Sequence, residues 1–303
     1  MKKALIILML ALMMLMPIAG ALNAISIEKA EEEPLKISME DFTHTVFVEY
    51  ATLTTCPPCI KANSQLYSIY DSGDLDFCYV TLVSDRGNIN VRLRLGELGV
   101  VAVPDVYFDG GYKRVSGGQA NEYPYRNAIT LCGERDVPDI DVDVNAEWKS
   151  KAIIKITVTV QNNEPTKYNG KLRVYITEKE SRWDDYGGNP YHFGVLDIPI
   201  DRNLAVVSQQ QSQPMSLGDT YTFTKTWYGA LHGFGDITKE NTLIIAAVFD
   251  KDTGYAVEAD AAEPTRDGAI NIPSKTMSPI FSLIKSLPDN NPLNNILNRI
   301  LSI

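Results

Sequence analysis

Two of the chain's four cysteines, Cys56 and Cys59, lie three positions apart in the segment TTCPPCIK. A Cys-x-x-Cys pair can exchange disulfides, brace a fold, bind a metal together with further ligands, or carry a haem. Haem attachment needs a histidine directly after the second cysteine, where Ile60 stands. A structural zinc site needs a second close pair, whereas Cys78 and Cys132 are far apart in the sequence. Thiol–disulfide exchange is therefore the favoured chemistry, and a purely structural disulfide is the alternative.

The residues around the pair predict a strand before it and a helix after it. Residues 46–50 form an apolar run that is typical of a buried strand. After the pair, apolar side chains recur at helical spacing, at Ala62, Leu66, Ile69 and Tyr70. The same spacing places Cys59 on the buried side of this helix and Cys56 at its start. Pro57 and Pro58 then occupy the first turn, where a missing N–H costs least.

The start of a helix stabilises a thiolate through unpaired N–H groups and the helix dipole. We therefore expect Cys56 to attack a substrate disulfide and the buried Cys59 to resolve the mixed disulfide that forms. This chemistry needs neither a cofactor nor a metal, and we expect none. Because the two prolines supply no N–H, the amides of Cys59 and Ile60 remain as donors to the thiolate. A less stabilised thiolate predicts a potential in the reducing half of the range for such pairs, which is roughly −270 to −120 mV.

Strands and helices alternate through the rest of the first region. In chain order, the pattern predicts a strand at 77–83, a helix at 90–98, a strand at 105–108, a turn at 109–111, a strand at 112–115 and a helix at 122–131. An alternation of this kind is typical of an α/β domain. We place that domain at residues 45–135.

Residues 45–134 resemble the thioredoxin fold. The strand VFVEY, the CPPC segment at a helix start and the segment VAVPDVYFDG at residues 101–110 carry the resemblance. It implies an α/β thioredoxin-like domain in which Pro104 is a cis proline that faces the cysteine pair. The surface implied to bind a substrate peptide comprises Val103, Pro104, Pro57 and Pro58.

The resemblance also implies an acid on the strand before the motif, which takes a proton from the buried cysteine. Glu49 is the candidate, although it stands seven residues before Cys56 and the family usually has an acid six before. One additional loop residue would be needed to accommodate this difference. A second departure is Thr55, because thioredoxins commonly have Trp at that position.

The other two cysteines, Cys78 and Cys132, fall in the second predicted strand and the last predicted helix. An even number of cysteines in an exported chain predicts a second, structural disulfide between them. Two buried free thiols are the plain alternative. A relay that reloads Cys56 and Cys59 is a third possibility.

After Pro138 the pattern changes to alternating apolar and polar residues, which predicts antiparallel strands. Their number and spacing indicate an all-β, immunoglobulin-like sandwich at residues 139–262. Residues 179–205 interrupt this pattern as a long insertion with Trp, Tyr and Gly, and such loops are often functional or flexible. The segment DKDTG at residues 250–254 fits a hairpin turn better than a calcium loop.

The whole-chain arrangement is similar to a family of secreted bacterial proteins grouped with an outer-membrane protein. The matching segments are EYAT before CPPC, LRVYITE at 172–178, YHFGVL at 191–196 and residues 244–250. This resemblance implies a surface or extracytoplasmic role without naming a substrate. The three histidines, His44, His192 and His232, show no metal or triad spacing and are expected to be structural.

Both ends of the chain carry patterns that differ from the two domains. Lys2 and Lys3, an apolar run at 4–16 and small residues at 19–21 predict a signal peptide at 1–21, followed by an acidic leader at 22–44. The apolar run is short for a membrane-spanning helix, which leaves a permanent anchor as the weaker interpretation. The tail at 263–303 contains two amphipathic segments, which would pack on the protein itself or contact a membrane surface or a partner.

The formal net charge is −10, and removal of a leader with two lysines would make it more negative. A surface of this charge repels phosphate backbones, so we expect no nucleic-acid partner. The sequence therefore predicts a secreted, extracytoplasmic or envelope-associated oxidoreductase. It would exchange disulfides with cysteine-containing secreted proteins, as a reductant or isomerase that a redox partner supplies with electrons. The alternative is an envelope-surface binding protein whose thioredoxin fold is only a scaffold.

Overall fold

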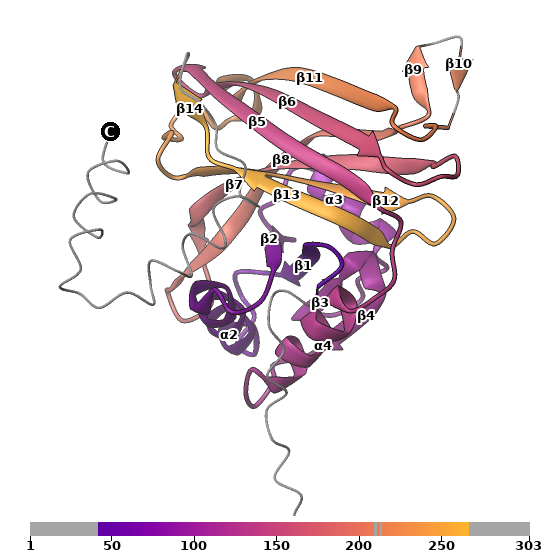
Figure 1. Ribbon diagram of the computed structural model, residues 1–303. Coiled ribbons are helices and arrows are strands. Elements are labelled where there is room, and N and C mark those ends of the chain that lie inside the picture. The colour runs from indigo at the N-terminus through magenta and orange to yellow at the C-terminus, as the bar shows by residue number, and fades with distance from the viewer. Residues whose placement is uncertain (1–41, 209–210, 213, 267–303) are drawn as a thin grey trace, which may run out of the picture. The chain divides into compact units, whose positions relative to one another are not determined.

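The structure of the protein is a computed structural model that describes residues 42–208, 211–212 and 214–266. The predicted signal peptide, the acidic leader up to residue 41 and the tail from residue 267 lie outside the described residues. Figure 1 shows the described elements in chain order, with helices α2 and α4 on one side and the strands of the second region on the other. We refer to residues 42–138 as the α/β part and to residues 139–266 as the β part.

The α/β part contains the alternating elements that the sequence predicts. They are β1 (Val46–Thr52), α2 (Cys59–Ser72), β2 (Phe77–Val83), α3 (Ile89–Glu97), β3 (Asp105–Phe108), the 3-10 turn η2 (Asp109–Gly111), β4 (Lys113–Ser116) and α4 (Tyr123–Gly133). Strand β1 is parallel to β2 and antiparallel to β3, which is antiparallel to β4. The result is a mixed sheet in the order β2-β1-β3-β4.

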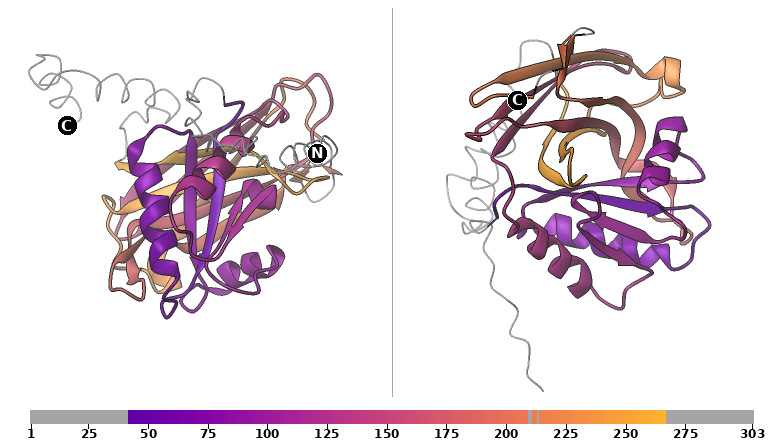
Figure 2. Two further views of the ribbon diagram at one scale, coloured as in Figure 1. Left: turned by 90° about the horizontal axis from the view of Figure 1, so that it is seen from below. Right: turned by 90° about the vertical axis from the view of Figure 1, so that its right-hand side faces the viewer.

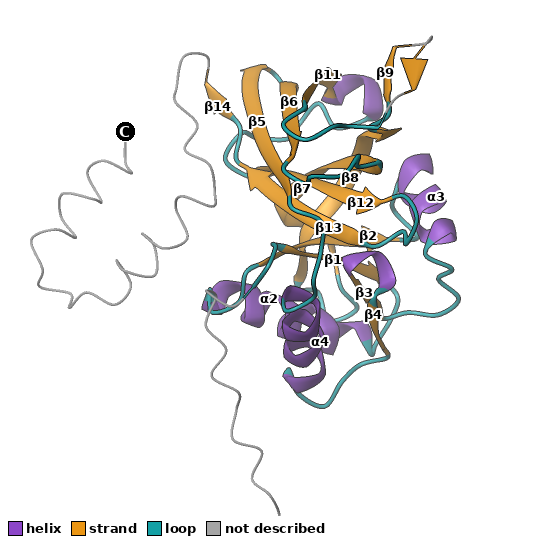
Figure 3. Ribbon diagram, turned by 45° about the vertical axis from the view of Figure 1, so that its right-hand side comes forward, coloured by secondary structure: helices purple, strands orange, loops and turns teal. Residues whose placement is uncertain are grey.

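Helices cover both faces of this sheet. Tyr70 of α2 packs on Tyr79 of β2, and Tyr125 of α4 packs on Phe108 of β3. Because side chains alternate along a strand, the neighbours of these residues face the other way. Figure 3 shows α2 and α4 together on one face and α3 on the other.

The β part contributes two sets of strands. They are β5 (Ile140–Ser150), β6 (Ile153–Asn162), β7 (Gly170–Asp184), β8 (Pro190–Asn203), β9 (Val206–Ser208), β10 (Gln211–Ser212), β11 (Thr220–Tyr228), β12 (Thr242–Asp250), β13 (Ala256–Ala262) and β14 (Thr265–Arg266). Strands β11-β6-β5-β14 form a four-stranded sheet, whereas β13-β12-β7-β8 continue into the sheet of the α/β part. The link is a parallel pairing of β8 with β2, at Thr81 and Gly194.

This pairing differs from the separate sandwich domain that the alternating pattern predicted. The structure shows an α/β part with a mixed sheet and, beyond it, a second β-sheet. Phe47 of β1 contacts Tyr175 of β7 and Phe249 of β12, so β7 and β12 cover the face of β1 that α2 leaves free. Figure 2 shows the resulting layers, with α2 and α4 on one side and the four-stranded sheet farthest from them. The alternation of residues along a strand does not determine which other strand it pairs with. The sequence pattern therefore could not predict that the β part continues the sheet of the α/β part.

The long insertion expected at residues 179–205 consists mostly of strands β7 and β8. Their pairing contains several register shifts, and both strands are buried on two faces for much of their length. Both features remove the period-2 alternation by which a strand is recognised. The two strands are joined by residues 185–189, which we call the β7–β8 turn. No helix among the described residues is long and apolar enough to span a membrane.

Candidate disulfide site

Cys56 and Cys59 form a disulfide at the start of α2, with their Cα atoms 5.4 Å apart. The Cys59 amide donates to the Cys56 carbonyl oxygen at 3.1 Å, which closes a turn around the two prolines. Helix α2 therefore begins at Cys59, three residues later than the sequence predicts. Cys59 is fully buried and Cys56 is 6% exposed, so only Cys56 is in contact with solvent.

The Val103–Pro104 peptide bond is cis, as the thioredoxin resemblance implies. The Cys56 Sγ atom lies 3.8 Å from the Val103 carbonyl oxygen, which places this peptide directly beside the disulfide. Pro104 is buried, whereas Pro57 and Pro58 are exposed. The structure thus brings together the four residues expected to bind a substrate peptide. Their contact with a substrate stays a prediction.

Asp105 holds the strand that follows the cis proline. Its carboxylate accepts hydrogen bonds from the Tyr107 hydroxyl at 2.6 Å, the Ser116 hydroxyl at 2.7 Å and the Arg114 Nε at 2.8 Å. Burial alone would raise the pKa of Asp105, but these hydrogen bonds and the Arg114 charge hold that pKa below its usual value. The ionised carboxylate thus fixes the β3–β4 hairpin next to Pro104.

Glu49 lies on the face of β1 that points away from the disulfide. Its carboxylate accepts from Arg94 Nε at 2.7 Å and Nη2 at 2.6 Å, and from the Tyr175 hydroxyl at 2.8 Å. We call these three residues the ion cluster. Burial would lower the pKa of Arg94, yet the charge and hydrogen bonds of Glu49 raise it above its usual value. The structure separates Glu49 from the cysteine pair, which corrects the expectation that it takes the proton of Cys59.

Tyr50, not Glu49, is the strand residue that faces the cysteine pair. Its hydroxyl donates to the Cys59 carbonyl oxygen at 3.0 Å, and burial raises its pKa well above the usual value. Tyr50 also stands six residues before Cys56, where the family usually has an acid. The group below Cys59 is therefore a neutral hydroxyl. The sequence could have identified Tyr50, because it lies six positions before Cys56 and needs no additional loop residue.

The β7–β8 turn contacts helix α2 just after the cysteine pair, and the sequence did not predict this. Asn63, one helical turn after Cys59, donates from Nδ2 to Asp185 Oδ2 at 3.1 Å and to the Pro190 carbonyl oxygen at 3.1 Å. We call this set of hydrogen bonds the turn contact. A buried Asn at an inward helical position is the only sequence signal for it, because such a side chain needs polar partners.

Comparison with known proteins adds to this geometry. No protein-family model matches the sequence, and no curated protein matches it. Among solved structures, HBP35 of Porphyromonas gingivalis matches with a TM-score of 0.55 and 13% identity, over 76% of this chain and 79% of that chain. This match agrees with three features of the chain: the mixed sheet, the disulfide at the start of α2 and the cis proline beside it. Together these observations decide the fold of the α/β part. The α/β part is thioredoxin-like.

Two further matches are weaker and carry no argument about this thioredoxin-like chain. The protein AGR_C_4864 of Agrobacterium tumefaciens has a TM-score of 0.46 and 13% identity, over 75% of this chain and 97% of that chain. A domain of the outer membrane lipoprotein Omp28 from Porphyromonas gingivalis has a TM-score of 0.26 and 21% identity, over 44% of this chain and 94% of that chain.

The second pair of cysteines does not form the expected disulfide. Cys78 and Cys132 are free, buried thiols. Cys78 lies between Phe77 and Tyr79, which both contact Tyr70 of α2, so its own side chain points to the other face of the sheet. Cys132 lies on α4, on the same face as α2. Burial raises the pKa of both thiols, which keeps them protonated and unreactive.

The histidines have structural surroundings, as expected. His44 Nε2 lies 2.9 Å from Asp109 Oδ2, and the rings of His192 and His232 stack on Tyr67 and Trp227. Residues 250–254 form a turn in which Asp250 Oδ1 accepts from the backbone, as in a hairpin. No group of three acidic, His or Cys side chains in the described part of the chain could hold a metal ion.

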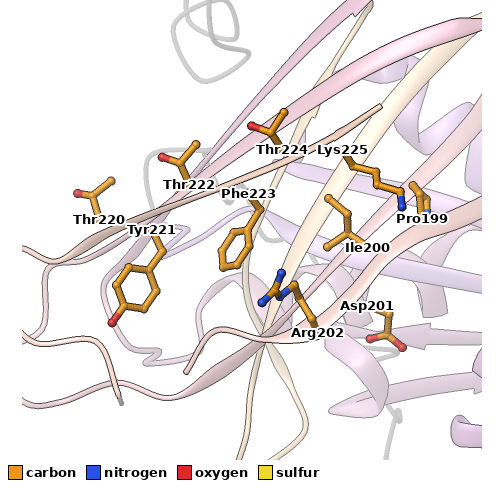
Figure 4. A pocket seen from close by; sticks show the side chains of 10 residues that line it. All are labelled: Pro199, Ile200, Asp201, Arg202, Thr220, Tyr221, Thr222, Phe223, Thr224 and Lys225. Atoms are coloured by element: carbon orange, nitrogen blue, oxygen red, sulfur yellow. The ribbon is translucent and has the colours of Figure 1, made fainter. Parts of the chain in front are cut away.

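A cavity of about 640 Å³ lies in the β part, between β8 and β11. Figure 4 shows the side chains that line it, among which the Arg202 guanidinium lies over the Phe223 ring at 5.0 Å. No cysteine lines this cavity. The cavity is therefore not the site of the disulfide chemistry, and we assign it no role.

Proposed function

We propose that the protein is an exported thiol–disulfide oxidoreductase that acts on cysteine pairs of secreted or envelope proteins. The observation that carries the proposal is the position of the Cys56–Cys59 disulfide. The outer sulfur lies beside the Val103 carbonyl and the cis proline, and the inner sulfur is fully buried behind it. A structural brace would not require the less buried sulfur to lie beside the carbonyl of a cis peptide bond.

The proposed reaction begins with the reduced pair. The Cys56 thiolate attacks one sulfur of a substrate disulfide, which forms a mixed disulfide and releases the other substrate sulfur as a thiolate that takes up a proton. The Cys59 thiol then loses its proton and attacks Cys56 Sγ, which breaks the mixed disulfide and releases the second substrate thiolate. Two electrons thus pass from the pair to the substrate. A dithiol donor returns them by the same exchange in reverse.

The surroundings of Cys56 favour the reducing direction. The two amides expected to support its thiolate are those of Cys59 and Ile60, and they donate to the carbonyl oxygens of Cys56 and Pro57. A thiolate with few donors is less stable, and the corresponding disulfide is a weaker oxidant. We therefore expect a reductant or isomerase. A redox titration against glutathione with a potential at the oxidising end of the range would contradict this direction.

The proposed location and partners depend on the pattern of residues 1–21. A signal peptide would deliver the mature protein to a compartment where substrate disulfides persist, and cysteine-containing secreted proteins would be the clients. We further propose that the β part is an immunoglobulin-like sandwich that holds the redox site in place. Its support is the second apolar core, which packs between β7-β12 and β5-β6. Detection of the mature chain outside the cytosol would test the location.

The activity is tested by reduction of insulin and by refolding of scrambled ribonuclease, with the purified mature protein and a Cys56→Ser variant. The proposal expects turnover by the wild-type protein and none by the variant, because the variant has no attacking sulfur. Equal rates for the two proteins would instead favour the alternative function, in which the thioredoxin-like fold is a scaffold in an envelope-surface binding protein.

A further inference from the structure

The β7–β8 turn lies along one side of helix α2, beside the cysteine pair. Three α2 positions on one stripe meet this region: Ile60, Asn63 and Tyr67. Besides the turn contact at Asn63, the Tyr67 ring stacks on His192 at a centroid distance of 3.4 Å. At the end nearest the disulfide, a Cβ atom on Gly187 would lie 3.3 Å from Ile60 Cδ1. The β part therefore packs against Ile60, the residue that directly follows Cys59.

The turn is held in one shape by Asp185. Its side chain is buried, and Oδ1 accepts hydrogen bonds from the amides of Gly187 at 2.8 Å and Asn189 at 3.1 Å. The other oxygen, Oδ2, accepts the hydrogen bond from Asn63. With both oxygens bonded, the carboxylate fixes the turn internally and fixes it to α2. Residues on the outer side of the turn are thus presented in a set position relative to the disulfide.

The residue presented on the outer side is Tyr186, which is 61% exposed. In the loop before the cis proline, Val101 is 88% exposed, and it stands two residues before Val103, whose carbonyl lies beside Cys56 Sγ. Pro57 and Pro58, which directly follow Cys56, are exposed as well. The exposed apolar residues that neighbour these contacts in the sequence therefore come from both parts of the molecule, and we call these four residues the apolar border. A cluster of exposed apolar groups around a functional group is typical of a binding surface.

We infer that Tyr186 is a specificity-determining residue, which packs against a bulky apolar side chain adjacent to the cysteine of a substrate. The inference rests on the proposed function and names the substrate class of that same site. The occupant is an extended polypeptide segment that carries the target disulfide. Because Cys56 is only 6% exposed, such a segment must lie across the apolar border before the two sulfurs can meet.

The charged residues near the start of α2 have both signs. Lys61 on α2 and Asp184 directly before the turn are exposed, and both carboxylate oxygens of Asp85 accept hydrogen bonds from Thr54, two residues before Cys56. A polar side chain beside the substrate cysteine would lose water against Tyr186 and Val101 without gaining a partner. An apolar side chain would instead remove apolar surface from water on both sides. The apolar border therefore favours substrates with an apolar side chain next to the cysteine.

The test compares three disulfides as substrates of the reduced protein. Two are disulfide-linked homodimers of a short peptide whose single cysteine is flanked by Leu or by Asn, which have similar shapes. The third is hydroxyethyl disulfide, which is too small to reach the border. For the wild-type protein we expect kcat/KM for the Leu peptide to exceed that for the Asn peptide about tenfold.

Tyr186→Ala should remove most of this preference, with a loss of about five- to tenfold on the Leu peptide and less than about twofold on the other two substrates. Tyr186→Phe should behave as wild type, because the ring makes the contact. Tyr228→Ala, at an exposed tyrosine of β11, is the matched control and should change nothing. An unchanged Leu preference in Tyr186→Ala would overturn the inference while leaving the proposed function intact. No turnover of hydroxyethyl disulfide by the wild-type protein would overturn both.

Discussion

Two contacts between the α/β part and the β part lie on opposite faces of β1 and have different surroundings. The ion cluster of Glu49, Arg94 and Tyr175 is excluded from water, because Glu49 and Tyr175 are fully buried. The turn contact of Asn63 with Asp185 and Pro190 lies at the border of the disulfide site. The difference teaches that the β part has two separate effects on the thioredoxin-like part: one contact stabilises the join, and the other shapes the access to Cys56.

The ion cluster extends into a longer series of charges along the same join. Arg94 also pairs with Glu97 at 3.2 Å, and Glu97 pairs with Arg173 of β7. Arg173 in turn pairs with Asp201 of β8 at 3.1 Å. Arg94 and Arg173 are buried, so loss of one of their acidic partners leaves a buried guanidinium with less counter-charge, and this loss costs more than the intact network contributes. The largest effects on stability are therefore expected on this face.

Glu49→Ala is expected to have the largest effect, a decrease of about 3–5 kcal/mol in the free energy of unfolding. The reason is that the buried Arg94 guanidinium would lose its bidentate carboxylate partner and keep only the ion pair with the more exposed Glu97. Urea denaturation of the oxidised protein measures the change. The rate at which Cys56 reacts with an alkylating agent should stay the same in the folded, reduced variant. A changed rate there would restore Glu49 as a group that acts on the thiols.

Asn63→Ala tests the second contact, the turn contact between α2 and the β7–β8 turn. It removes the donor to Asp185 Oδ2 and to the Pro190 carbonyl, so that the buried Asp185 Oδ2 keeps only the long hydrogen bond from Asn189 Nδ2 at 3.4 Å. We expect a loss of about 1–3 kcal/mol, smaller than at Glu49. Reduction of protein substrates should slow more than reduction of hydroxyethyl disulfide, because the β7–β8 turn is no longer fixed. Equal slowing of both would mean that Asn63 supports only the fold.

Acid stability should depend on Asp105, beside the cis proline. Its pKa in the folded protein is below the unfolded value of about 3.9. Its ionised form therefore stabilises the protein fully above that value, and the stabilisation is lost as the pH falls through the lower, folded-state pKa. The difference in unfolding free energy between wild type and Asp105→Asn should shrink below about pH 4. A difference that stays constant down to pH 2 would contradict this assignment.

The smallest effects are expected at the free cysteines. Cys78→Ala and Cys132→Ala should each cost about 1 kcal/mol through lost packing, and should leave disulfide exchange unchanged. The oxidised protein, denatured without reductant, should take up an alkylating agent at two thiols. Finding no reactive thiol under these conditions would show that Cys78 and Cys132 are bridged after all.

Much of the α/β part could be predicted from the sequence, because its strands and helices have strong and distinct periods. The apolar run at 46–50 and the helical stripe through Leu66 both became elements of the core. The join to the β part could not be predicted. It depends on the single pairing of Thr81 with Gly194, and on strands β7 and β8, whose register shifts and two-sided burial hide their alternation.

The site was predictable where a motif determines the geometry and failed where the geometry depends on distant segments. CPPC and the segment around Pro104 identified the disulfide and the cis proline. Glu49 was misplaced because a shift of one residue moves a strand side chain to the opposite face, where Arg94 neutralises it. Tyr186 could not be found, because it stands far from the cysteines in the sequence, in a segment that looked like an irregular insertion.

The central claim is that Cys56 is the attacking sulfur and Cys59 the protected one. It is tested most directly by the pH dependence of alkylation of the reduced, folded protein, with the modified cysteine identified by mass spectrometry. The account predicts that Cys56 reacts first, with an apparent pKa below the free-thiol value of about 8.5, and that Cys59 stays unmodified. An apparent pKa for Cys56 at the free-thiol value, or equal modification of both cysteines, would contradict it.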